Sequence, residues 1–184
     1  MVHYVNLPLT EEKAKQLRCG DTVYLTGEVY TSRDAGHKRM VELLSRGEAL
    51  PFDPMNATIY YVGPSPAKPG QVIGSAGPTT SGRMDAYAPT LLAVGARGMI
   101  GKGARTPEVI QAMKDHCGVY FGAIGGAGAL LARCIKKAEL IAWEDLQSEA
   151  LRRLWVENMP LVVVIDCEGN DLYQQGRADY LASR

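Results

Sequence analysis

The apolar and polar positions of this chain alternate between two periods. β-Branched and aromatic residues gather in short runs that favour strands, at 21–30, 58–62, 97–100, 119–124, 138–143, 161–166 and, more briefly, from Val72. Between these runs, apolar residues recur at the spacing of an amphipathic helix, over 10–19, 34–46, 84–94 and 106–116. Strands and helices that follow one another in this way predict an α/β layered domain.

Capping residues and prolines set several of the expected boundaries. Thr106 stands where an N-cap residue would begin a helix, and Pro107 follows at the first helical position. Pro89 lies inside the segment 84–94, so that helix is expected to kink or to start late. The run Leu161–Ile165 is apolar at every position, which is typical of a strand covered on both faces.

The composition is that of an ordinary globular chain without net charge. Its 184 residues include 20 basic and 20 acidic side chains, and 46% are hydrophobic. This length suits a single domain, expected over 1–184, that buries a core without a disulfide or metal. Zero net charge gives no electrostatic basis for binding nucleic acid or anionic lipid. No apolar run reaches the ~20 residues of a membrane span and no signal pattern opens the chain, so the expected location is the cytoplasm.

The four cysteines predict no metal site within this chain. Cys19, Cys117, Cys134 and Cys167 are far apart in the sequence and form no CxxC pair, so neither a zinc knuckle nor a local iron–sulfur motif is written here. Buried free thiols are expected instead, because an unpaired cysteine often packs as a small hydrophobe.

Two arginine-bearing loops are the strongest candidates for chemistry. The segment 31–38 (TSRDAGHK) lies where a strand leads into a helix, and its polar side chains join the N–H groups of the helix start in a way that favours an anion. An Asp or Ser N-cap with solvated neighbours explains the same spacing. The segment 74–85 (GSAGPTTSGRMD) combines glycines, hydroxyl groups and an arginine, which suit a carboxylate or phosphate. A flexible turn is its alternative, and it matches no nucleotide-binding motif.

Glycine is concentrated in the middle of the chain, where 14 of the 20 glycines lie between Gly63 and Gly128. Such clustering predicts loops whose backbone turns tightly or approaches a ligand. Lys102 stands between two glycines, a weak signal by itself, and the segment 122–128 is interpreted as close backbone packing. From the residues alone, the chain is an α/β domain with two loops able to clamp a small dianion, and no reaction is specified.

Four motifs taken together resemble a known family. They are Leu25–Gly27, 31–39 (TSRDAGHKR), 77–85 (GPTTSGRMD) and 101–103 (GKG). They are similar to the β subunit of class I fumarate hydratase, and equally to that of L(+)-tartrate dehydratase, from Pro8 to about Gly169. The resemblance implies a swivelling β/β/α domain with a mixed sheet flanked by helices. It also implies a [4Fe-4S] cluster whose cysteine ligands lie in a partner α subunit, and this would account for the absence of a matching cysteine here.

The resemblance implies roles for individual residues. Arg33 and Arg83 match the arginines that bind the substrate carboxylates. Thr79 matches the threonine proposed as catalytic base, and Lys102 matches a lysine that holds or polarises the substrate. A threonine hydroxyl is an unpromising base at its ordinary pKa, so it needs a neighbouring carboxylate or cation.

Three further residues are expected to support the arginines, on their positions in the sequence. Asp34 and His37 are predicted to fix Arg33, and Asp85 is predicted to fix Arg83. None of these residues is predicted to bind a metal.

The functional expectation is a hydro-lyase that interconverts L-malate and fumarate plus water, with an active site shared with the α subunit. Fumarate is favoured over tartrate because fumarate hydratases are the more frequent of the two enzymes, and no residue of this chain decides between them. Two other readings stay open, a non-catalytic module that binds dicarboxylates and a plain interaction domain. In isolation, the chain is expected to form a homodimer through the surface that normally meets the α subunit.

Overall fold

A run of parallel strands forms the centre of the fold. The computed structural model describes residues 1–183, and the strand order of its sheet is β1-β2-β3-β4-β5-β7-β6. The strands are β1 (Val2–Asn6), β2 (Thr22–Thr31), β3 (Thr58–Tyr60), β4 (Gly98–Gly101), β5 (Val119–Gly122), β6 (Ile135–Ala142) and β7 (Leu151–Ile165). Strands β1 to β5 pair in parallel, whereas β7 is antiparallel to β5, β6 and β2. Because β7 pairs with β2 as well as β5, the sheet closes on itself as a small barrel.

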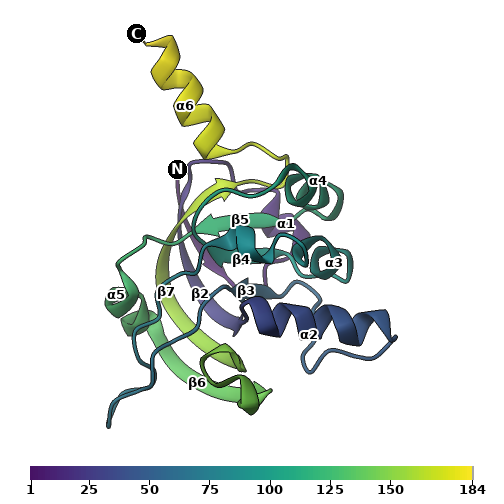
Figure 1. Cartoon of the computed structure of the whole chain (residues 1–184). Coiled ribbons are helices and arrows are strands. Elements are labelled where there is room, and N and C mark those ends of the chain that lie inside the picture. Colours follow the sequence, from purple (N-terminus) through teal and green to yellow (C-terminus); the bar gives the residue numbers. More distant parts are fainter. Residues whose placement is uncertain (184) are drawn as a thin grey trace.

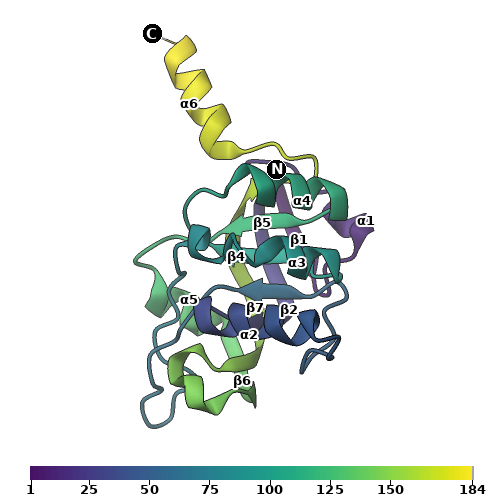
Figure 2. The same ribbon diagram turned by 45° about the vertical axis from the view of Figure 1, so that its right-hand side comes forward.

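The helices differ in how they lie against this sheet. They are α1 (Glu11–Ala14), α2 (Asp34–Ser45), α3 (Ala88–Ala93), α4 (Pro107–His116), α5 (Gly128–Cys134) and α6 (Leu172–Ala182), with two 3₁₀ turns, η1 (Ser81–Met84) and η2 (Glu144–Glu149). Helices α2, α3 and α4 lie side by side across β3, β4 and β5, and α5 lies beside β7 (Figures 1 and 2). Helix α6 projects away from the body of the protein. The predicted α/β class, a mixed sheet flanked by helices, is confirmed.

Successive residues on the central strands face two different cores. Tyr60 lies in the core that the closed sheet surrounds, whereas Tyr61 lies in the core between the sheet and helices α2, α3 and α4. Phe121 and Tyr120 on β5 are divided in the same way, and all four side chains are buried. This alternation is what a strand covered on both faces requires, as predicted for Leu161–Ile165.

Most of the expected elements are present, with two corrections. The run at Val72 is not a strand, because prolines and glycines interrupt residues 63–79 and Val72 itself is exposed. The helix expected over 10–19 is limited to α1, and irregular turns lead from it to Gly20, whose φ is +88°. The expected late start beside Pro89 is confirmed, since Pro89 lies in the first turn of α3. No helix within residues 1–183 has the length and apolar character needed to cross a membrane.

Candidate active site

The predicted functional residues follow the carboxyl ends of three neighbouring parallel strands. Arg33 comes after β2, Thr79 lies in the long connection that follows β3, and Lys102 directly follows β4. Strands β2, β3 and β4 are adjacent, so these segments meet at one edge of the sheet. The carboxyl ends of parallel strands are where both open and closed α/β folds commonly bind ligands.

Main-chain hydrogen bonds join the segments that carry Thr79 and Lys102. The Lys102 N–H donates to the Thr79 carbonyl at 3.3 Å, and the Ser81 N–H donates to the Lys102 carbonyl at 2.8 Å. The Thr79 N–H in turn donates to the Tyr61 carbonyl at 2.7 Å. Residues 79–81 therefore extend the sheet beside Lys102 in parallel register.

A single carboxylate, that of Asp34, lies between the two predicted arginines. Arg83 Nε donates to Asp34 Oδ1 at 2.9 Å, and Arg83 Nη2 lies 2.8 Å from Asp34 Oδ2. Arg33 Nε lies 3.8 Å from the same Oδ2 atom. Asp34 is thus within ion-pair distance of Arg33, but its closer partner is Arg83.

The two arginines differ in exposure. The Arg83 side chain is 51% exposed, whereas that of Arg33 is 23% exposed. Gly63 allows this enclosure, because a Cβ atom at Gly63 would lie 2.6 Å from Arg33 Nη1. Within residues 1–183, the buried Arg33 Nε has no hydrogen-bond partner, so the guanidinium keeps an unused donor.

His37 contacts the main chain of Arg33. His37 Nδ1 lies 2.9 Å from the Arg33 carbonyl oxygen and 2.8 Å from Ser32 Oγ. Burial lowers the pKa of His37 to about 4, so the ring is neutral at pH 7. A carbonyl can only accept, so Nδ1 carries the proton in that bond. His37 thus holds the backbone at the start of α2, where Arg33 stands.

Asp85 binds a different residue from the one expected. Asp85 Oδ1 accepts a hydrogen bond from Arg105 Nε at 2.7 Å, and Oδ2 accepts one from the Thr106 N–H at 2.7 Å. The structure therefore corrects the prediction that Asp85 fixes Arg83. The reason is geometric, because Arg83 turns toward Asp34 on the neighbouring strand end while Asp85 points into the interior.

Two residues near the site were not anticipated from the sequence. Glu149 Oε2 accepts a hydrogen bond from the Ala35 N–H at 2.8 Å, and its Oε1 lies 3.5 Å from Arg33 Nη2. Glu149 ends η2, far from Arg33 along the chain, and no local pattern links the two residues. Arg105 was missed because arginine is usually expected at the surface, whereas this side chain is buried.

The glycine-rich segment 122–128 packs closely against the site loops, as interpreted from the sequence. The Ala76 N–H donates to the Gly128 carbonyl at 3.1 Å, and a Cβ atom at Gly128 would lie 2.9 Å from the Gly77 nitrogen. A Cβ atom at Gly125 would lie 3.8 Å from Lys102 Nζ. The exposed Lys102 side chain therefore lies beside this segment, while its main chain pairs with the loop that carries Arg83.

The site gathers more positive than negative charge. Three cations, Arg33, Arg83 and Lys102, lie with the carboxylates of Asp34 and Glu149 at one edge of the sheet. Planar guanidinium groups bind carboxylates through two parallel hydrogen bonds. The arrangement is suited to a small molecule that carries more than one carboxylate.

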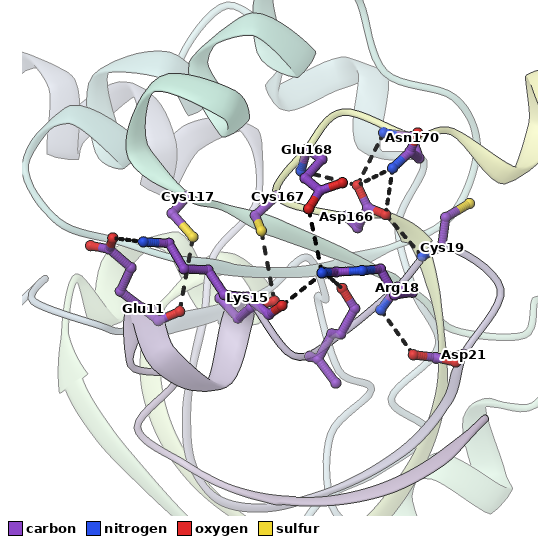
Figure 3. Close-up of polar contacts among 12 residues, drawn as sticks. Glu11, Lys15, Arg18, Cys19, Asp21, Cys117, Asp166, Cys167, Glu168 and Asn170 are labelled. Carbon is purple, nitrogen blue, oxygen red and sulfur yellow. Dashed lines mark hydrogen bonds and ion pairs between the residues drawn. The ribbon is translucent and has the colours of Figure 1, made fainter.

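Within residues 1–183, the cysteines are not grouped so that they could hold a metal cluster. Cys19 directs its thiol at the main-chain carbonyl of Val164. Cys117 directs its thiol at that of Glu11 (Figure 3), and Cys167 directs its thiol at that of Ala14. Burial raises the pKa of Cys19 and Cys167 to about 11, so both thiols remain protonated at neutral pH. Among residues 1–183, no three His, Cys, Asp or Glu side chains are placed to hold one metal ion. The residues of this described part of the chain therefore do not fit an iron–sulfur cluster, which needs several thiolates.

The thiols of Cys117 and Cys167 border a hollow of about 710 Å³ that is separate from the site. Its walls come from α1 and from the C-terminal ends of α3 and α4. Charged pairs such as Lys15–Glu11, at 2.6 Å, cross its rim. None of the predicted site residues lines this hollow.

Comparisons with known proteins give a family match and several relatives. The model of the fumarase C-terminus family matches residues 2–176. The chain is 37% identical over 180 residues to a putative L(+)-tartrate dehydratase subunit beta from Methanocaldococcus jannaschii, covering 95% of this chain and 92% of that protein.

Two longer enzymes are also similar. The chain is 38% identical over 175 residues to the aerobic class I fumarate hydratase of Salmonella typhimurium, covering 93% of this chain and 30% of that protein. It is 41% identical over 153 residues to the mitochondrial fumarate hydratase 1 of Leishmania major, covering 82% of this chain and 28% of that protein. The chain thus spans about a third of the length of these enzymes.

Proposed function

The chain belongs to the fumarase C-terminus family, and from this premise we propose that it is the β subunit of a hydro-lyase that interconverts L-malate and fumarate plus water. The names of its relatives support a hydro-lyase of four-carbon dicarboxylates. A relative named as a beta subunit that aligns along 92% of its length supports the subunit role. That same relative favours a second candidate, the β subunit of an L(+)-tartrate dehydratase.

One observation carries the proposal, the pairing of Arg33 and Arg83 across Asp34. Arg83 uses Nε and Nη2 for Asp34, and within residues 1–183 Nη1 is left free to bind another carboxylate. Arg33 lies against the same carboxylate through Nε, 3.8 Å from Asp34 Oδ2, and its side chain is 23% exposed. Two guanidinium groups held in this way can each bind one end of a dicarboxylate, with Asp34 keeping them apart.

Lys102 and Thr79 supply the remaining polar groups at the reacting centre. In the proposed mechanism, the Lys102 ammonium stabilises the negative charge that develops on the substrate when a carbon-bound proton is removed. Thr79 is the proposed base, and its main-chain bond to Lys102 keeps the hydroxyl-bearing segment close to that cation. A nearby cation favours the deprotonated form of a hydroxyl, which this residue needs in order to accept a proton.

We propose that an α subunit completes the site and holds the [4Fe-4S] cluster. The Arg83 side chain is 51% exposed and Lys102 is exposed as well, so water reaches both cations in this chain alone. Charge stabilisation in an active site is much stronger when water is excluded. A partner that covers this edge of the sheet would provide that exclusion. Without the partner, the same open surface is the proposed contact of a homodimer.

A non-catalytic dicarboxylate-binding module is the alternative of a different class. It shares the arginine pair but requires no partner and no turnover. The isolated chain would then bind a dicarboxylate by itself, with the same affinity whether or not an α-type protein is present.

The test is turnover by the reconstituted complex. The chain is co-expressed anaerobically with an α-type subunit, and fumarate production from L-malate is followed by ultraviolet absorbance, with L(+)-tartrate in parallel. We expect malate turnover that requires both chains. Preferential turnover of tartrate would keep the hydro-lyase and change the substrate. A stable complex with activity on neither substrate would contradict the proposed reaction.

A further inference from the structure

A buried arginine lies directly beneath the candidate site. The Arg105 side chain has 0% exposure, and its Nε donates to Asp85 Oδ1 at 2.7 Å. Its other donors reach Tyr61 Oη and Met99 Sδ, each at 3.4 Å. The guanidinium carbon also lies 5.3 Å from the centre of the Tyr61 ring and 5.0 Å from that of Tyr120, so the charge is enclosed between two aromatic rings.

The Arg105–Asp85 pair joins the two loops that carry the proposed substrate-binding cations. Asp85 is the C-cap residue of η1 and lies two positions after Arg83. Arg105 lies three positions after Lys102, in the segment that leads from β4 to α4. The second oxygen of Asp85 accepts the Thr106 N–H, so the carboxylate grips this segment at two consecutive residues.

Tyr120 makes a second link between the same loops. Its hydroxyl lies 2.9 Å from the Gly103 carbonyl and 2.9 Å from Ser81 Oγ. Since a carbonyl only accepts, the Tyr120 hydroxyl donates to Gly103 and accepts from Ser81. Gly101 leaves room for this contact, because a Cβ atom there would lie 1.9 Å from Ser81 Oγ.

Stability alone does not account for this arrangement. Removing a guanidinium and a carboxylate from water is costly, and buried ion pairs often contribute little net stability compared with apolar side chains of similar volume. The buried guanidinium of Arg105 also has little opposite charge around it. Within residues 1–183, Asp85 is the one carboxylate that forms an ion pair with Arg105.

We propose that Arg105 is a positioning residue that sets the spacing between the Arg83 guanidinium and the Lys102 ammonium. Through Asp85 it fixes the end of η1, and through its own backbone it fixes the loop that follows Lys102. Tyr61 and Tyr120 hold the guanidinium in one orientation. The inference rests on the proposed function, because the spacing matters only if both cations act on one dicarboxylate.

The test compares three variants in the reconstituted complex. Arg105→Met with Asp85→Asn removes both charges and keeps a carbonyl that can accept the Thr106 N–H. Arg105→Lys keeps the charge but cannot reach Asp85, Tyr61 and Met99 together. Arg97→Met is the matched control, because Arg97 is also nearly buried, at 11% exposure, and binds carbonyls of His116 and Cys117 at the opposite end of β4.

The Michaelis constant separates positioning from a purely structural role. A smaller folded fraction lowers the apparent kcat but leaves KM unchanged. We expect the double variant to raise KM for the dicarboxylate about tenfold and to lower kcat, since misplacing one charge-assisted contact costs roughly that factor. Arg105→Lys should raise KM by a smaller factor, and Arg97→Met should leave KM at the wild-type value. A wild-type KM in the double variant would overturn the inference.

Hydrogen exchange keeps the test independent of turnover. The Ser81 and Lys102 amides bond across the two loops, so their exchange reports whether the loops stay joined. We expect at least tenfold faster exchange in peptides spanning 79–85 and 100–106 of the double variant and of Arg105→Lys, and no change in Arg97→Met. Unchanged exchange in both Arg105 variants would contradict the inference, whereas absence of wild-type turnover would contradict the proposed function alone.

Discussion

Replacement of Arg83 by lysine tests the proposed clamp most sharply, because the geometry gives the arginine two tasks at once. Arg83 Nε and Nη2 bind the two oxygens of Asp34, and Nη1 remains for a substrate carboxylate. A lysine has one nitrogen and a compact charge, so it cannot bind Asp34 and hold an oriented substrate at the same time. The substitution therefore keeps the positive charge at this position, but it removes the planar group that can bind Asp34 and a substrate carboxylate together.

The expected loss follows from the number of contacts. One charge-assisted hydrogen bond contributes about 1.5–3 kcal/mol, which corresponds to roughly a 10- to 150-fold decrease in kcat/KM. The free energy of unfolding should change little, since Arg83 is 51% exposed and an ion pair of this kind contributes at most ~1 kcal/mol. Activity and stability are thus predicted to respond very differently to Arg83→Lys.

The assay is steady-state turnover of L-malate by the complex, with thermal unfolding measured on the same preparations. Arg46→Lys is the matched control, because Arg46 is also exposed, at 58%, and pairs with Glu48 at 2.6 Å, at the other end of α2. We expect Arg46→Lys to retain wild-type kinetics. If Arg83→Lys also retained wild-type kcat/KM, Arg83 would not bind the substrate and the clamp would be wrong.

Three further predictions concern other parts of the site. Gly63→Ala should raise KM about tenfold, because the added Cβ would lie 2.6 Å from Arg33 Nη1 and displace it, whereas Gly176→Ala, with open space around it, should not. The folded-state pKa of His37, about 4, lies below its ordinary value of 6.5, so below pH 6.5 the unfolded chain binds a proton that the folded chain excludes. The free energy of unfolding should therefore fall by up to ~3 kcal/mol between pH 6.5 and 4 relative to His37→Asn in urea titrations, and equal slopes would refute the assignment. Thr79→Val should lower kcat roughly 100-fold with little change in KM if the hydroxyl is the base, and Thr79→Ser should retain most of the activity.

The central strands and helices were predictable because the apolar residues of each recur with the spacing of a strand or of a helix. Strand β2 and helices α2 and α4 begin and end close to the expected residues, since capping residues, proline and glycine mark their limits. The first half of β7 was missed for a physical reason. Its buried residues Leu154, Val156 and Met159 do not keep a two-residue spacing, because the strand bulges at Asn158, whose φ is +47°.

The sequence predicted the features of the site that depend on neighbouring residues in the chain, but not the contacts between distant segments. The loops that carry Arg33 and Arg83 were visible from their glycines, hydroxyls and charges. The partners of these residues were not, because they depend on which strands are adjacent. Asp34 meets Arg83 because β2 and β3 are neighbours, and Glu149 reaches α2 because β7 returns beside β2.

The central claim is that two arginines bind the two carboxylates of one substrate. Competitive inhibition of the complex by succinate and by butyrate, which has one carboxylate fewer, measures this directly. The account predicts that succinate binds at least about tenfold more tightly, and that Arg33→Met or Arg83→Met abolishes most of the difference. Equal inhibition by the two acids, or a preference that survives both substitutions, would contradict the clamp.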